Sequence, residues 1–149
     1  MENEKSIEET ENEIIEDFKL LDAWDEDQKY EYIIDMGKKL PSLDDVYKTS
    51  ENVIKGCQST VWLASDFIDN KVHFKADSNS VITKGLISML IQVLSGHTPD
   101  EIIAARLEFI NTIGMHSHLA QTRSNGLLAM VKQMKNYALA YKLKNAAKA

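Results

Sequence analysis

The segment 81–94, VITKGLISMLIQVL, constrains the fold more than any other part of the chain. Asn79 or Ser80 can cap a helix here, Gly96 can end it, and the helix is apolar on nearly every face. A helix without a polar face must be surrounded by other elements. We therefore place it at the centre of the fold, with the apolar members Val81, Ile82, Leu86, Ile87, Met89, Leu90, Ile91, Val93 and Leu94.

Two helices are predicted before this segment. In the first, Ile14, Ile15, Phe18 and Leu21 recur at helical spacing, and order is expected to begin near Glu11. The second has a start signal around Asp25 and closes with Lys38 and Lys39. Residues 41–52 then have the composition of a loop.

Strands are predicted between the second helix and the central one. A short Val53-Ile54 is followed by Thr60 to Ile68, and then by the alternating residues Val72, Phe74 and Ala76. Asp69-Asn70 is predicted to form a hairpin turn, because both residue types tolerate left-handed backbone angles. We expect a small antiparallel sheet of three strands.

The chain after Gly96 predicts more helix. Thr98-Pro99-Asp100-Glu101 combines an N-cap, a proline at the first helical position and a capping-box glutamate. A short turn at 107–113 precedes a long amphipathic helix with the stripe Leu127, Val131, Met134, Ala138 and Tyr141. The order of helices, strands and helices predicts an α+β fold, in which a small antiparallel three-stranded sheet packs against several helices.

Length and composition exclude several classes of protein. The 149 residues, 44% of them hydrophobic, suffice for one domain. We assign that domain to 1–149, with an ordered core at 14–143 and a mobile acidic tail at 1–12. No apolar run reaches the ~20 residues of a membrane span. The first residues also lack the basic and apolar parts of a signal peptide, so we expect a cytoplasmic protein.

Charge is unevenly distributed along the chain. Residues 1–17 hold eight acids and one lysine, whereas six Lys or Arg and no acid follow Glu108. Solvated faces and favourable interactions with helix dipoles explain such a split. The alternative is a basic last helix that docks on a partner. The net charge of −6 argues against nucleic acid.

Cys57 is the only cysteine. One cysteine can form no intramolecular disulfide and cannot supply a zinc or iron–sulfur site from one chain. It is either a small packed hydrophobe or a reactive thiol. Gly56 places it at a loop tip, where the cation of Lys55 would favour an accessible, partly ionised thiol. Gly85 is interpreted as the point where this loop approaches the central helix.

Five blocks of sequence resemble one family. They are GCQSTVW at 56–62, WDEDQKYEYIIDMGKKLP at 24–41, ADSNSVITKGLI at 76–87, TPDEI at 98–102 and HLAQTRSNGL at 118–127. Together they resemble the SufE-type sulfur acceptors of iron–sulfur cluster assembly, over roughly residues 14–143. The resemblance implies a two-layer SufE-like/IscU-like fold.

The resemblance also implies a function for Cys57. In that family the cysteine accepts sulfur from the persulfide of a SufS-type, PLP-dependent cysteine desulfurase and passes it to a SufBCD-type scaffold. The chain would be an accessory protein and activator of the desulfurase rather than a stand-alone enzyme, with no cofactor and no metal of its own. A homodimer is left open, and no nucleic acid or membrane is expected.

Other residues of these blocks are candidates for supporting or partner-binding roles. Gly56, Gln58 and Ser59 belong to the signature around the cysteine. Arg123 matches an arginine of the family and would contact the desulfurase or the persulfide charge, with an ion pair or loop anchor as the alternative. His118 lies in a matching block, and its alternative is a surface or capping role.

Three alternatives stay open. The chain could serve a paralogous desulfurase outside the cluster-assembly operon. It could be a thiol hydrolase or transferase in which His116 or His118 activates Cys57. It could be a non-catalytic interaction module that uses its lysine-rich last helix, with Cys57 packed. For the leading interpretation, we hypothesise that Cys57 is sheltered in the free protein and moves outward on docking.

Overall fold

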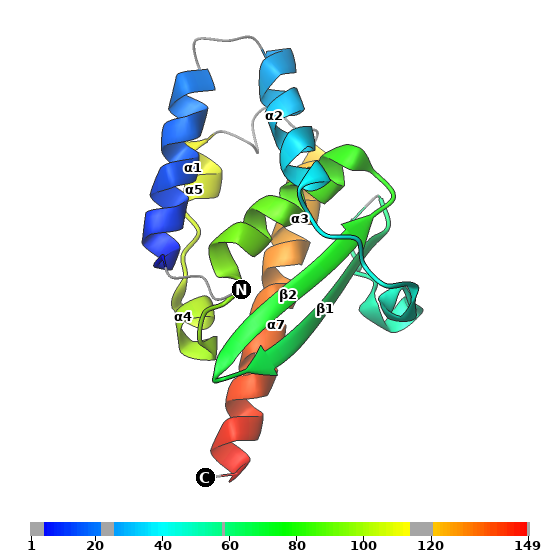
Figure 1. Ribbon diagram of the computed structural model, residues 1–149, viewed down its shortest axis with the longest axis vertical. Coiled ribbons are helices and arrows are strands. Elements are labelled where there is room, and N and C mark those ends of the chain that lie inside the picture. Colours follow the sequence, from blue (N-terminus) through cyan, green and yellow to red (C-terminus); the bar gives the residue numbers. More distant parts are fainter. Residues whose placement is uncertain (1–4, 22–25, 58, 114–120, 149) are drawn as a thin grey trace.

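The computed structural model describes residues 5–21, 26–57, 59–113 and 121–148, which form an α+β fold (Figure 1). Two short 3-10 turns, η1 and η2, precede the sheet. The elements are α1 (Ile7–Leu21), α2 (Glu26–Lys38), η1 (Asp45–Tyr47), η2 (Ser50–Asn52), β1 (Val61–Ile68), β2 (Lys71–Ser78), α3 (Val81–Leu94), α4 (Pro99–Ala104), α5 (Phe109–Thr112) and α7 (Gln121–Lys148).

The sheet has two antiparallel strands in the described part of the chain, so the prediction of a third strand is not confirmed. β1 and β2 pair from Val61 opposite Ser78 to Ile68 opposite Lys71, and the turn between them has φ of 52° at Asp69 and 63° at Asn70, as predicted. Val53 makes only an isolated bridge with Trp62. The chain turns away at Gly56, so this segment is too short for a ladder.

α3 is the central helix, as predicted. The Ser80 hydroxyl accepts a hydrogen bond from the N–H of Thr83 at 3.4 Å, which caps the helix. α3 packs against α2 and β2. Ten of its residues are buried: Ile82, Thr83, Gly85, Leu86, Ile87, Ser88, Met89, Leu90, Val93 and Leu94.

Gly85 lets α2 and α3 approach closely. A Cβ at Gly85 would lie 2.0 Å from the carbonyl oxygen of Ile33, which no side chain can tolerate. The expectation that Gly85 receives the Cys57 loop is therefore wrong, because the neighbouring backbone belongs to α2.

α7 crosses behind the strand pair in Figure 1 and carries the predicted stripe, in which Val131 and Tyr141 are partly buried. Leu127, Met134 and Ala138 are each at most 2% exposed. The hydroxyl of Tyr137 donates to the carbonyl of Leu63 at 3.1 Å, and the ring of Tyr141 stacks on Phe67 at a centroid distance of 4.7 Å. These contacts fix the position of α7 against β1.

Helix α1 begins at Ile7, earlier than the predicted start near Glu11. The hydroxyl of Ser6 accepts a hydrogen bond from the N–H of Glu9 at 3.0 Å, which satisfies a free donor at the helix start. Thr10 is only 7% exposed. The acidic residues from 7 to 12 are therefore helical and do not form a tail, while residues 1–4 lie outside the described residues.

The loop at 41–52 is tied to the sheet, which fixes the approach to Cys57. Asp77 on β2 pairs with Lys48 at 3.2 Å and with Lys84 on α3 at 3.4 Å. The ammonium of Lys75 lies 3.7 Å from the ring centroid of Tyr47. These contacts join η1, β2 and α3.

Two lysines of α7 have partners in or just after α4: Lys135, which is partly buried, and Lys142, which is exposed. The ammonium of Lys135 donates to the carbonyls of Ile103, at 3.2 Å, and Ala105. Lys142 pairs with Asp100 at 2.7 Å. The capping box of Thr98 and Glu101 is formed as predicted and sets the start of α4. In the described residues, no helix is long and apolar enough to cross a membrane.

Candidate functional site

Cys57 lies at the tip of a tight loop, as predicted. Gly56, which precedes it, has φ of +97°, a conformation that strongly favours glycine. The N–H of Ile54 donates to the carbonyl of Val61 at 2.8 Å and closes the base of the loop. Ile54 and Val61 are buried, so the tip stands on a rigid base.

The Cys57 side chain rests against α7. Its Sγ lies 3.7 Å from the carbonyl oxygen of Gly126, within reach of a weak S–H hydrogen bond. A Cβ at Gly126 would lie 3.6 Å from this sulfur, and a Cβ at Gly56 would lie 3.3 Å from the Cβ of Ala129. The loop therefore lies directly on the helix, and Gly56 is the position where a side chain would be crowded. The thiol is half-buried, which agrees with the hypothesis of a sheltered cysteine.

Burial raises the pKa of the Cys57 thiol above its ordinary value. The expectation that Lys55 makes the thiol partly ionised is therefore wrong for the free protein. Lys55 is exposed, and water weakens the field of its charge at the sulfur. The thiolate, which is the nucleophilic form, is disfavoured until the surroundings of the sulfur change.

A groove of about 460 Å³ runs beside the loop, between the segment 50–55 and α7. We call it the loop groove. Its lining carries two lysines, one glutamate, and both apolar and amide side chains: Ser50, Glu51, Val53, Ile54, Lys55, Ala129, Lys132, Gln133 and Asn136.

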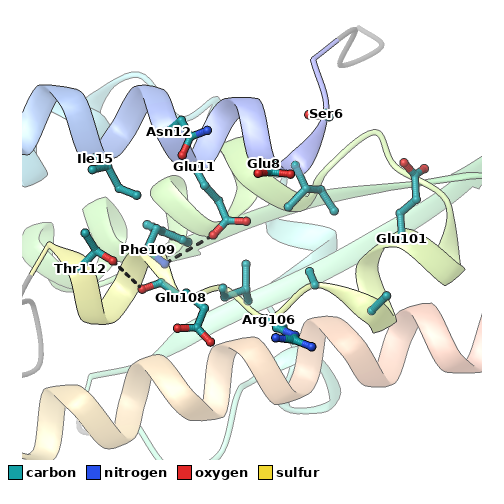
Figure 2. Close-up of a pocket in the computed structure, with 14 residues that line it drawn as sticks. Ser6, Glu8, Glu11, Asn12, Ile15, Glu101, Arg106, Glu108, Phe109 and Thr112 are labelled. Atoms are coloured by element: carbon teal, nitrogen blue, oxygen red, sulfur yellow. Dashed lines mark hydrogen bonds between the residues drawn. The ribbon is translucent and has the colours of Figure 1, made fainter.

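A larger groove, of about 690 Å³, lies between α1 and the chain from α4 to α5 (Figure 2). Its lining includes the carboxylates of Glu8, Glu11, Glu101 and Glu108 and the guanidinium of Arg106. The N–H of Phe109 donates to Glu11 at 3.4 Å, and burial raises the pKa of Glu11 despite this bond. This groove shares no lining residue with the loop groove and is separate from Cys57.

The predicted supporting residues fall partly outside the described structure. Gly56 and the half-buried Ser59 flank the Cys57 loop. Gln58, His116 and His118 lie outside the described residues. Arg123 lies in α7, but its side chain is not among those described.

Sequence reasoning missed the contacts of Gly126 and Ala129 with the loop. Gly126 is part of a block that resembles the family, but nothing in the chain alone indicates that it touches the cysteine. Within the residues that the structure describes, no group of three or more His, Cys, Asp or Glu could hold a metal ion.

The fold and the family comparison together define a class of small α+β proteins connected with iron–sulfur metabolism. The family model described as "Fe-S metabolism associated domain" matches residues 12–138. That range contains the Cys57 loop, the sheet and most of α7. The chain belongs to the SufE family.

Named relatives support the same family. An uncharacterized SufE-like protein of Rhizobium meliloti is 36% identical over 85% of this chain and 93% of its own length. SufE-like protein 1, chloroplastic/mitochondrial, of Arabidopsis thaliana is 41% identical over 78% of this chain but only 32% of its own length. An uncharacterized SufE-like protein of Synechocystis is 36% identical over 80% of this chain and 75% of its own.

One solved structure shows the same fold. The solution structure of a hypothetical protein from Thermus thermophilus matches with a TM-score of 0.71. The match covers 88% of this chain and 94% of that one, at 16% identity. It extends the fold to a distant sequence.

Proposed function

We propose that this protein is a sulfur carrier, which accepts sulfur from the persulfide of a cysteine desulfurase on Cys57 and delivers it to an iron–sulfur scaffold complex. The observation that carries the proposal is the position of the only cysteine. Cys57 is held half-buried at the tip of a glycine turn, in a chain of the SufE family.

The transfer requires one thiolate and one persulfide. The Cys57 thiolate attacks the terminal sulfur of the donor persulfide, and a new S–S bond forms at Sγ. The donor's S–S bond breaks, and its electron pair leaves on the donor cysteine as a thiolate. Charge and atoms balance, because one thiolate is consumed and one is released. No cofactor on this chain is needed for this step.

The surroundings of Cys57 fit a carrier better than a self-activated nucleophile. Burial raises the pKa of the thiol, which favours its protonated form and slows its reaction with small electrophiles in the free protein. A persulfide in the same place would be shielded from reductants. Docking then moves the loop outward, and the hinge is Gly56, whose backbone conformation few other residues adopt.

The rate of the desulfurase tests this proposal. Alanine release from cysteine should be measured with and without the protein, in the presence of a reductant that removes carried sulfur. We expect the wild-type chain to raise the rate and Cys57→Ser to leave it at the level of the desulfurase alone. Equal stimulation by both chains would contradict a role for Cys57 as carrier.

A further inference from the structure

The loop groove is bordered by the candidate site itself. Ala129 lines the groove, and a Cβ on Gly56 would lie 3.3 Å from the Cβ of Ala129. One wall, residues 50–55, leads directly into the Cys57 loop. Anything that occupies the groove therefore touches both the chain that enters the loop and the helix on which the thiol rests.

The charge of this groove differs from that of the whole protein. The chain carries a net charge of −6, yet the groove has two lysines, Lys55 and Lys132, against one glutamate, Glu51. Neither ammonium forms an ion pair with a carboxylate of the described residues. By contrast, Lys142, which lies in α7 with Lys132, is paired with Asp100 at 2.7 Å. The two groove lysines are thus available to an external anion.

One exposed apolar side chain of α7 lies beside the groove. Leu128 is 67% exposed, and it lies one helical turn from Lys132 on the same face. The lining also contains the amide groups of Gln133 and Asn136 and the hydroxyl of Ser50, which can donate and accept hydrogen bonds. This combination fits an extended peptide segment that carries carboxylates and an apolar side chain.

We propose that the loop groove binds an acidic segment of the sulfur donor, and that Lys132 contacts this segment and so guides the donor to Cys57. This inference rests on the proposed carrier function and adds the chemistry of the partner surface. Attraction between the lysines and carboxylates would speed association and would weaken as salt screens the charges.

Affinity for the cysteine desulfurase of the same organism is the test, measured by titration calorimetry with full-length chains at low and high salt. Lys132→Glu should weaken binding at least tenfold at low salt and reduce the salt dependence. Asn136→Lys, which adds a cation to the same lining, should tighten binding. Lys144→Glu is the matched control, since Lys144 is exposed on the same helix but does not line the groove, and it should change the affinity less than twofold.

The outcomes separate this inference from the proposed function. Unchanged affinity of Lys132→Glu, or equal losses in Lys132→Glu and Lys144→Glu, would overturn the docking groove. If Lys132→Glu instead abolished self-association and left desulfurase binding intact, a second copy would occupy the groove and the inference would also fail. Sulfur uptake by the wild-type chain is scored separately, because its absence would overturn the carrier function itself. Thermal unfolding of each variant should match the wild type.

Discussion

The sulfur of Cys57 lies 3.7 Å from the carbonyl oxygen of Gly126, a residue 69 positions later in the chain. This contact joins the loop that carries the thiol to the last helix, α7. The exposure of the thiol therefore depends on the face of α7 that contains Gly126.

Replacing Gly126 with alanine should cover the thiol without unfolding the protein. The new Cβ would lie 3.6 Å from Sγ, an ordinary van der Waals contact. Removing a helical glycine should add about 0.5–1 kcal/mol to the free energy of unfolding. Alkylation of Cys57 by iodoacetamide should become slower. The exposed Leu128→Ala is the control and should leave the rate unchanged, whereas faster alkylation of Gly126→Ala would contradict the described packing.

The reactivity of Cys57 should depend on pH in a way that reports its burial. Because burial raises the pKa of the thiol, the alkylation rate of the folded protein should reach its midpoint at a higher pH than that of the denatured chain. Folding stability should fall as the pH rises through the ordinary thiol pKa, since the unfolded chain loses its proton first. A folded midpoint below the denatured one would show an activated thiolate instead.

His97 should make the protein sensitive to mild acid. Its side chain is 6% exposed, and Nε2 has no hydrogen-bond partner among the described residues. Burial, aided by the charge of Lys71, lowers the pKa of His97 although Glu101 opposes this. His97 of the unfolded chain therefore binds a proton at its ordinary pKa of ~6.5, whereas His97 of the folded chain binds it only at a lower pH. The free energy of unfolding should fall between pH 7 and pH 5, by about 1.4 kcal/mol for each unit that separates the two pKa values.

Urea denaturation at the two pH values measures this effect. His97→Gln should reduce the difference between them, and His73→Gln, which removes a histidine from β2, should leave it in place. A pH difference that is the same in wild type and His97→Gln would show that another group is responsible.

Asp77 should stabilise the loop that precedes the site. Burial raises the pKa of Asp77, but the N–H of Ser78 and the cations of Lys48 and Lys84 outweigh it, so the pKa lies below its ordinary value. Asp77→Asn should lower the free energy of unfolding by about 1–2 kcal/mol at neutral pH. The loss should shrink as the pH falls from the ordinary carboxyl pKa through the lowered pKa of the folded chain, because Asp77 of the unfolded wild type is protonated first and the folded carboxylate follows.

Asp45→Asn is the control for Asp77→Asn, because it removes a different carboxylate that pairs with Lys48. Asp45 is 94% exposed and lies 3.7 Å from Lys48. An ion pair that is so exposed contributes little, so its removal should change the stability by less than about 0.5 kcal/mol. If the two variants lost equal stability, the network at Asp77 would not be the anchor of the loop.

Local signals made much of the fold predictable. The apolar segment of α3, the Asp69-Asn70 turn and the capping box at Thr98 each depend on neighbouring residues, and each formed as predicted. The prediction of a third strand was not confirmed, because the segment Val53-Ile54 leads directly into the turn at Gly56. The start of α1 lies earlier than predicted. The sequence did not reveal these first turns, because their many acidic residues do not indicate packing.

The candidate site was only partly predictable. The turn at Gly56 placed Cys57 on a loop, but the contacts of Cys57 with Gly126 and of Gly56 with Ala129 join residues far apart in the chain, which a single sequence does not reveal. The predicted effect of Lys55 on the thiol is wrong for the same reason, since burial depends on α7. Likewise, only the packing of α4 shows that Lys135 and Lys142 have partners within the chain.

Sulfur transfer to Cys57 is tested most directly by the mass of the protein after it has been mixed with a desulfurase that carries a persulfide. The desulfurase is incubated with cysteine, mixed with the wild-type chain without reductant, and the chain is analysed by intact mass and peptide mapping. A sulfur carrier should gain one sulfur atom, located on the peptide that contains Cys57 and removed by a reductant. No added sulfur on the wild-type chain, or the same gain on Cys57→Ser, would contradict it.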